Sequence, residues 1–491
     1  MPSTFFGIET AYSALQADQA ALAVTGANIA NVNTPGYSRQ TVTMQTNDPW
    51  EPASAGPASP GPLGTGISVG SINRVVNAFV NQQIYSANSQ NGSLSNLTTM
   101  ANQVQSAFNE PSGTGIGDDM TTFFNAFSTL ASDPTSESDR STVLSAAQAV
   151  VDQFHSVSSA LSQIAPQVQT QVSADVTQVN QYATQIAQLN GEIRGQVEQG
   201  EQPNDLEDQR DELINKLSGL VNVNTTNGVN AGTGQPNGVV DVSIGSFSLV
   251  QDTTAASLPS TVSTASANDL GLQNSSGQVV PVTGGEIYGL IKSQTLVAGY
   301  QSSLDNLASN LASAVNSIHK TGYGLDGSTG NEFFSASTAG AGQTQVTAAN
   351  ISLSAAVANN PDAIAAAVPI TPTPATGEPF ASGNGDIATQ IAGLATTPVM
   401  GNSSLDDYYN NLIGQIGADA QNFTNESDNQ TSILQQLQSQ QSSASGVSLD
   451  EELSNQMMYE QAYQAAANVM SVQNTVIGTI MSTLGSVSTT S

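Results

Sequence analysis

The sequence predicts a mainly α protein with β-rich insertions, in which the terminal helices form a coiled coil and longer helices form a core bundle. Three observations support this fold class. Apolar residues recur at alternating spacings of three and four near both ends of the chain. Similar stripes follow in the interior, and two segments rich in Gly, Thr and Ser interrupt them. The 491 residues are enough for about three domains.

The N-terminal stripe predicts a helix over residues 5–29. It ends before Pro35, which disfavours a helical conformation at Thr34, and Gly36 permits a tight turn. A short strand over 41–45 and a loop over 49–66 are expected next. The stripe consists of Phe5, Ile8, Tyr12, Leu15, Gln19, Leu22, Gly26 and Ile29.

The C-terminal stripe has the same spacing and predicts a second terminal helix. Ser448 and Glu451 fit a capping box at its start. The acidic residues of 450–452, like those of 205–212, are interpreted as solvated groups that favour the positive end of a helix dipole. The stripe consists of Tyr459, Tyr463, Ala466, Met470, Gln473, Ile477, Ile480 and Leu484.

The interior predicts long helices over about 143–186, 300–318 and 405–437, the first interrupted near Pro166. Segments 222–285 and 321–400 are predicted to be β-rich or loop-rich insertions, and in the first of them Val240, Val242 and Ile244 alternate as in a strand. The expected domains are a terminal coiled-coil domain of 1–70 and 445–491, a helical core of 71–221, 286–320 and 401–444, a β-rich insertion of 222–285, and a Gly/Ala/Thr/Pro-rich insertion of 321–400.

The terminal helices are expected to need partners. The free energy gained when one such helix buries its apolar side chains is smaller than the entropic cost of ordering its backbone. The terminal domain is therefore expected to be disordered in the isolated monomer and to fold on assembly, with the other terminus and neighbouring copies as partners.

Composition argues against several classes of partner. The formal net charge is −31, and the eight basic residues are scattered singly, so neither nucleic acid nor an anionic membrane surface is expected as a partner. The absence of cysteine excludes disulfides and thiolate metal sites. No run reaches about 18 apolar residues, and no basic residue precedes Arg39. Export, if it occurs, is expected to use a route without a cleaved signal peptide.

Two strings resemble catalytic motifs but lack the required context. Residues 66–70 match a nucleophile elbow around Ser68, yet a loop precedes them, and the candidate bases His155 and His319 lie in or at the end of predicted helices. Residues 322–327 match a dinucleotide fingerprint but follow a helix rather than a strand. The sequence therefore predicts no enzyme and no catalytic, cofactor-binding or metal site.

Residues 28–40 resemble the N-terminal motif of the flagellar axial proteins, the family of rod, hook and junction subunits. The ending Ser-Arg-Gln favours the first hook–filament junction protein within that family. Residues 445–452, followed by 459–465, resemble the family's C-terminal motif, and 203–211 and 123–127 are similar to internal motifs of the junction protein. The N-terminal motif residues are Asn31, Asn33, Thr34, Pro35, Gly36 and Tyr37.

This resemblance implies a secreted structural subunit at the hook–filament junction. It implies export by the type III apparatus, and an export chaperone that binds the C-terminal helix. It also implies self-assembly into a ring or helical layer, with the hook protein and the second junction protein as neighbours. The terminal helices would run antiparallel, with the β-rich domains outside. The alternatives are another axial protein (second junction protein, hook protein or flagellin), or a secreted adhesin or enzyme carried on the same scaffold.

Overall fold

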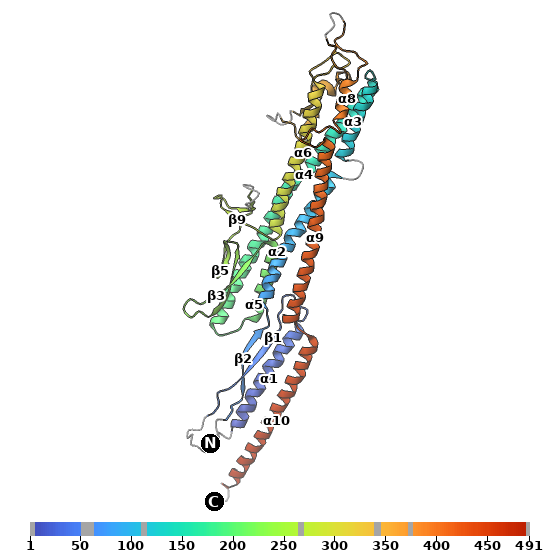
Figure 1. Ribbon diagram of the computed structural model, residues 1–491. Coiled ribbons are helices and arrows are strands. Elements are labelled where there is room, and N and C mark those ends of the chain that lie inside the picture. Colours follow the sequence, from blue (N-terminus) through green and yellow to red (C-terminus); the bar gives the residue numbers. More distant parts are fainter. Residues whose placement is uncertain are drawn as a thin grey trace. The chain divides into compact units, whose positions relative to one another are not determined.

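The computed structural model describes residues 5–50, 63–109, 115–263, 270–337, 345–371 and 377–487. The fold is mainly α with small antiparallel sheets, as predicted (Figure 1). The helices are α1 (Phe6–Ala30), α2 (Ala78–Phe108), α3 (Ile116–Ser132), α4 (Glu137–Glu198), α5 (Asn204–Leu220), α6 (Glu286–His319), α7 (Ala355–Ala358), α8 (Asp386–Gly393), α9 (Leu405–Ser445) and α10 (Leu449–Val487), with a 3₁₀ turn at Pro361–Ala363.

The strands belong to four separate sheets within the described residues. β1 (Gln40–Thr46) pairs with β2 (Ile67–Arg74), and β10 (Phe334–Ala336) pairs with β11 (Ile351–Leu353). A four-stranded sheet has the order β3 (Asn224–Val229), β4 (Pro236–Ile244), β5 (Phe247–Gln251) and β6 (Thr254–Ala255). A three-stranded sheet has the order β7 (Thr261–Val262), β8 (Gly271–Gln273) and β9 (Val279–Pro281).

Contacts divide the chain into two compact units. Unit 1 comprises 1–89, 178–258 and 431–491, and unit 2 comprises 90–177 and 259–430. Helices α2, α4 and α9 contribute residues to both units. Helix α4 continues through Pro166, where the sequence analysis expected an interruption. The four-part division from the sequence stays a prediction.

Unit 1 holds both terminal helices. Helix α1 packs against α10 and against the β1–β2 pair, and the two helices run antiparallel (Figure 1). The sheet β3–β6 buries Val240, Val242 and Ile244, the alternating residues that predicted a strand there. Asn190 of α4 holds this sheet, because its amide donates to the carbonyls of Val240 and Asp252.

Unit 2 has an aromatic core between α3, α6 and the chain that follows α6. Phe123 and Phe127 of α3 lie with Phe333 at centroid distances of 5.1–5.7 Å, and all three are fully buried. Arg140, 1 % exposed, donates to the carbonyls of Pro134 and Ile364. The 321–400 segment thus contributes directly to the core of this unit. Within the described residues, no helix is both long enough and apolar enough to cross a membrane.

Candidate functional site

The α1–α10 pair is the first candidate site, because both predicted stripes lie in it. The antiparallel alignment is fixed by two contacts: Gly7 lies against Gln473, and the Asn28 amide donates to a Glu452 oxygen at 3.0 Å. Partly buried positions recur along α10 at spacings of three and four, as in a coiled-coil seam. They are Asn455, Tyr459, Ala462, Ala466, Met470, Gln473 and Ile477.

The residues predicted for the C-terminal interface differ in how far they are buried. Tyr459, Met470 and Ile477 lie in this partly buried seam, whereas Tyr463 and Ile480 are exposed on the described chain. The backbone of Leu484 belongs to α10, and its side chain lies outside the described residues. The predicted stripe therefore overlaps the contact with α1 without coinciding with it.

The N-terminal stripe is covered less than expected. Ile8, Leu15, Leu22 and Ile29 are partly buried, but Phe5 and Tyr12 are exposed. The most buried residues of α1 are mostly small or polar, because β1–β2 covers a second side of the helix. They are Ala11, Ala17, Asp18, Ala21, Val24, Thr25 and Asn28.

A polar cluster joins the end of α1 to the start of α10. Tyr37 donates to the Asn28 side-chain oxygen at 2.9 Å, and Arg39 forms ion pairs with Glu451 at 2.7 Å and Glu452 at 2.9 Å. Glu452 is only 2 % exposed. The interpretation of Glu452 as a solvated dipole partner is therefore wrong, since its carboxylate is buried against Arg39 and Asn28.

The acidic start of α5 also has a specific partner. Arg74 of β2 contacts Glu207 at 2.7 Å, Asp208 at 2.8 Å and Asp211 at 2.9 Å. Burial alone would lower the pKa of Arg74, but the charges of Asp211, Glu207 and Asp208 outweigh it and raise the pKa. The Ser38 amide donates to Asp208 at 2.8 Å, so α5 also holds the end of the motif loop.

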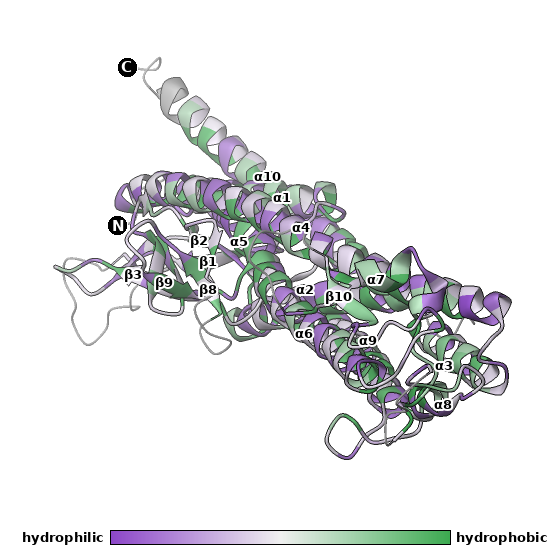
Figure 2. Cartoon of the chain, turned by 90° about the horizontal axis from the view of Figure 1, so that it is seen from above, coloured by the Kyte–Doolittle hydropathy of each residue, from purple (hydrophilic) through white to green (hydrophobic). Residues whose placement is uncertain are grey.

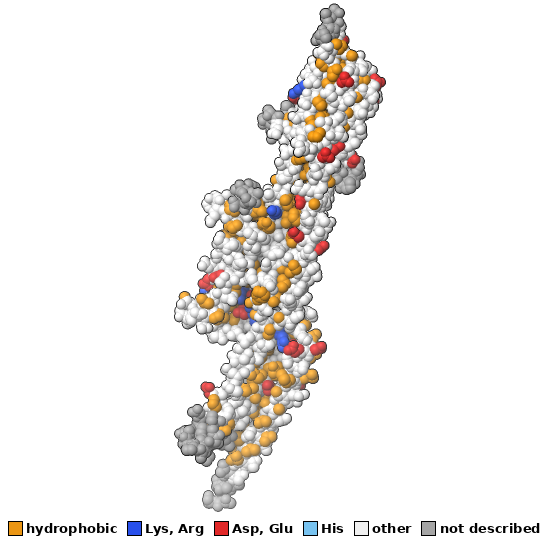
Figure 3. All heavy atoms as spheres, in the orientation of Figure 1, with side chains coloured by type: hydrophobic (Ala, Val, Ile, Leu, Met, Phe, Trp, Pro, Cys, Tyr) orange, Lys and Arg blue, Asp and Glu red, His pale blue; other side chains and the backbone are white. Residues whose placement is uncertain are grey.

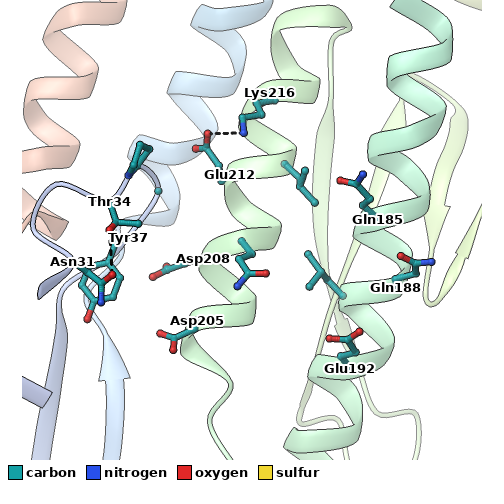
Figure 4. A pocket seen from close by; sticks show the side chains of 15 residues that line it. Asn31, Thr34, Tyr37, Gln185, Gln188, Glu192, Asp205, Asp208, Glu212 and Lys216 are labelled. Carbon is teal, nitrogen blue, oxygen red and sulfur yellow. Dashed lines mark hydrogen bonds and ion pairs between the residues drawn. The ribbon is translucent and has the colours of Figure 1, made fainter. Parts of the chain in front are cut away.

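The motif loop (residues 31–37) forms one wall of a groove in unit 1, with a volume of about 610 Å³ (Figure 4). Asp205 and Asp208 point from α5 toward this loop, and Lys216 pairs with Glu212 at 3.4 Å. The lining is Asn31, Thr34, Pro35, Gly36, Tyr37, Gln185, Gln188, Leu189, Glu192, Asp205, Asp208, Gln209, Glu212, Leu213 and Lys216. Asn33 is exposed and does not line the groove.

Gly36 allows the motif loop to pack closely against α5. Its φ is +80°, a conformation that side chains disfavour, and an added Cβ would lie 3.0 Å from the Glu212 Cβ. Burial, followed by the charges of Asp205, Asp208 and Glu452, raises the pKa of Tyr37 to about 12. The loop is thus held tightly in a negative field. Sequence reasoning missed this groove, since its walls come from separate parts of the chain.

The catalytic look-alike residues occupy ordinary structural positions. Ser68 lies within β2 of unit 1, whereas His155 and His319 belong to unit 2. His319, 1 % exposed, bonds through Nδ1 to the Asn331 carbonyl and accepts through Nε2 from the Ala365 amide, both at 2.9 Å. The turn over 322–327 follows α6 directly, as the sequence predicted.

Comparisons with known proteins agree with this geometry. Residues 101–334 match the family model of the flagellar hook-associated protein FlgK helical domain. Residues 8–37 match the flagella basal body rod protein model, and 438–483 match the C-terminal model of the flagellar basal body rod proteins.

Full-length relatives and a solved structure extend the similarity. The chain is 30 % identical to flagellar hook-associated protein 1 of Bacillus subtilis, over 99 % of each chain. It is 27 % identical to the protein of that name from Escherichia coli, over 96 % of this chain and 99 % of that one. The flagellar hook junction protein FlgK of Burkholderia pseudomallei shares the fold with a TM-score of 0.61 at 20 % identity, covering 74 % of this chain and all of that one. The chain therefore belongs to the flagellar hook-associated protein 1 family, structural proteins of the hook–filament junction.

Proposed function

We propose that the chain assembles into a ring or helical layer at the junction through its α1–α10 pair. The observation that carries this proposal is a second apolar stripe on α10, beside the seam that faces α1. Its residues are exposed by 46–62 % and repeat mostly at spacings of three and four. They are Met458, Val469, Val472 and Val476.

The terminal pair also carries very few charges. In α10, acidic residues occupy positions 450–452 at the start of the helix, and Glu460 is the one charged residue that follows them. Helix α1 contains two charged residues, Glu9 and Asp18. Figure 2 shows apolar segments along α10, and Figure 3 shows hydrophobic side chains gathered over the terminal helices. Exposed apolar side chains that gather on one face of a helix mark an interaction site. Neighbouring copies fit it, because uncharged stripes on both sides pack without burying an unpaired charge.

The neighbours along the axis are proposed to be the hook protein on one side and the second junction protein on the other. Before assembly, the chain passes through the type III export apparatus. An export chaperone covers the apolar side of α10 in the cytoplasm, in the way that grooved proteins bind amphipathic helices. The exposed stripe supports this step, since uncovered apolar surface would cause premature association.

A strain that lacks the chain and is complemented with variants tests the assembly surface. Val472→Asp places a carboxylate in the stripe, where burial between copies leaves it uncompensated. Val472 is 62 % exposed, so the fold of the single chain should be unchanged. We expect hooks without filaments and filament protein released into the medium. The exposed Asn474→Asp is the matched control and should give normal filaments. Equal filament counts for both variants would overturn the proposed surface.

A further inference from the structure

Several asparagines of this chain precede a glycine, the sequence context in which an asparagine side chain reacts most readily with the main chain. Because glycine has no Cβ, its backbone nitrogen can approach the side-chain amide of the preceding asparagine without steric hindrance. Asparagine is one of the thermolabile residues of proteins. The asparagines in this context are Asn91, Asn190, Asn227, Asn237 and Asn384.

The structure restrains four of these Asn-Gly pairs. Asn91 and Asn190 lie within α2 and α4, where main-chain N–H groups are hydrogen-bonded along the helix, and Asn190 is also fully buried. The Asn237 side-chain oxygen accepts a main-chain hydrogen bond at 3.1 Å. The Asn384 side-chain amide donates to Asp386 at 2.8 Å. In each of the four pairs, hydrogen bonds must therefore break before the side chain can reach the glycine nitrogen.

Asn227 is placed differently, near the end of an edge strand. β3 stands at one end of the strand order in its sheet, and edge strands open more easily than central ones. The pairing of β3 with β4 shifts between Asn227 and Val229, so Gly228 has no partner in the described register. Asn227 is exposed, and within the described residues its side chain forms no hydrogen bond. The side chain can therefore turn toward the Gly228 nitrogen, and water can reach both groups.

We propose that Asn227 is a site of spontaneous deamidation. The Gly228 backbone nitrogen loses its proton and attacks the Asn227 Cγ. The bond from Cγ to Nδ2 breaks, and Nδ2 leaves with that proton as ammonia, which closes a succinimide ring. Water then opens the ring. Cleavage of the ring bond to Cγ gives aspartate, and cleavage of the ring bond to the main-chain carbonyl carbon gives isoaspartate. Water is the sole co-reactant, and nothing is oxidised or reduced.

The modification changes β3 without requiring the unit to unfold. Either product adds one carboxylate to a chain whose formal net charge is already −31. Isoaspartate also carries the main chain through the side-chain carbon, which lengthens it by one methylene group. The interrupted register beside Asn227 accommodates this change, so the pairs that Asn224, Thr225 and Thr226 form with β4 remain. The β3–β6 sheet thus becomes more acidic as the protein ages.

Peptide mapping by mass spectrometry tests the proposal. The full-length protein is incubated at neutral pH, either folded or unfolded in guanidinium chloride, and the conversion of each Asn-Gly pair is followed with time. All the pairs should react at similar rates in the unfolded chain, since each is attacked by a glycine nitrogen. In the folded chain, Asn227 should react within about threefold of its unfolded rate, because opening the end of an edge strand costs little. The other pairs should be slowed at least about tenfold, which corresponds to about 1.4 kcal/mol of added barrier.

Two results of this mapping would overturn the proposal. One is a folded-state rate at Asn227 that is slowed as much as at the other pairs. The other is a folded-state rate at any other pair that equals or exceeds the rate at Asn227.

Enzymatic labelling of isoaspartate with an isoaspartyl methyltransferase gives a second readout on aged, folded protein. Asn227→Gln should reduce the labelling to background, because the longer side chain would have to close a larger ring. Asn224→Gln, exposed on the same strand but followed by threonine, is the matched control and should leave the labelling unchanged. Labelling that persists in Asn227→Gln would show that the isoaspartate arises elsewhere and that the assignment is wrong.

Discussion

Replacing Arg74 with methionine is expected to destabilise unit 1 by about 3 kcal/mol, the lower end for a broken buried ion pair. The Arg74 side chain is 11 % exposed and contacts three carboxylates within 2.9 Å. Methionine keeps much of the apolar stem but leaves Glu207 and Asp208 without a cation, while Asp211 keeps only the longer contact with Arg210 at 3.8 Å. Asp208, 7 % exposed, accounts for most of the loss, since Glu207 and Asp211 are each 24 % exposed and water solvates them in part.

The Ser38 amide remains bonded to Asp208 in this variant, which is why the lower end of the range applies. Hydrogen exchange on the full-length protein measures the effect at residues 204–212. A loss of about 3 kcal/mol corresponds to exchange that is about a hundredfold faster. The matched control is Arg194→Met, because Arg194 and Asp252 are paired at 2.6 Å but are 34 % and 55 % exposed. That control should change exchange near its own pair by less than about fivefold.

A double-mutant cycle adds a stricter test. Asp208→Asn in the Arg74→Met background removes a buried charge that has lost its partner, so part of the lost protection should return. If Arg74→Met accelerates exchange no more than Arg194→Met, the three-carboxylate contact contributes little. The account of how α5 holds the motif loop would then be wrong.

Three further outcomes are expected. Burial lowers the pKa of His319 in the folded protein. The neutral imidazole therefore contributes its full stability above the unfolded-state pKa of about 6.5. That contribution is lost as the pH falls through the lower pKa of the folded state. Hydrogen exchange at the Ala365 amide, corrected for the intrinsic exchange rate at each pH, measures this effect. On acidification the amide should lose more protection in the wild type than in His319→Phe. Equal losses in the two proteins would contradict this. Hydrogen exchange on a proven monomer should show weak protection in α1 and α10, and strong protection there would show that the pair folds without neighbours. Ile477→Asp should impair both chaperone pull-down and filament counts, because it places a carboxylate at a partly buried position of the α10 seam, whereas Asn474→Asp should be mild. Normal binding and filaments with Ile477→Asp would separate the two surfaces.

Local periodicity predicted helices within α1, α4, α6, α9 and α10, whereas α2, α3 and α8 were not among the predicted helices. The alternating spacing of Tyr459, Met470 and Ile477 predicted the seam on α10, and Pro35 with Gly36 predicted the end of α1. The strand at Val240–Ile244 also followed from local alternation. The same spacing in Val469, Val472 and Val476 was available in the sequence, and reading it would have revealed the second stripe.

The tertiary structure decided which partners cover these faces. Glu452 and Asn28 are 424 positions apart, and Arg74 lies 134 positions before Asp208, so no local pattern indicates either contact. The acidic starts of α5 and α10 look alike in sequence, as groups that favour a helix dipole. Burial against Arg74 and Arg39 distinguishes them from solvated residues, and burial depends on chain segments brought together by folding. Periodicity in a sequence identifies the apolar side of a helix, but only the packed chain determines which charges lose water and must find a counter-ion.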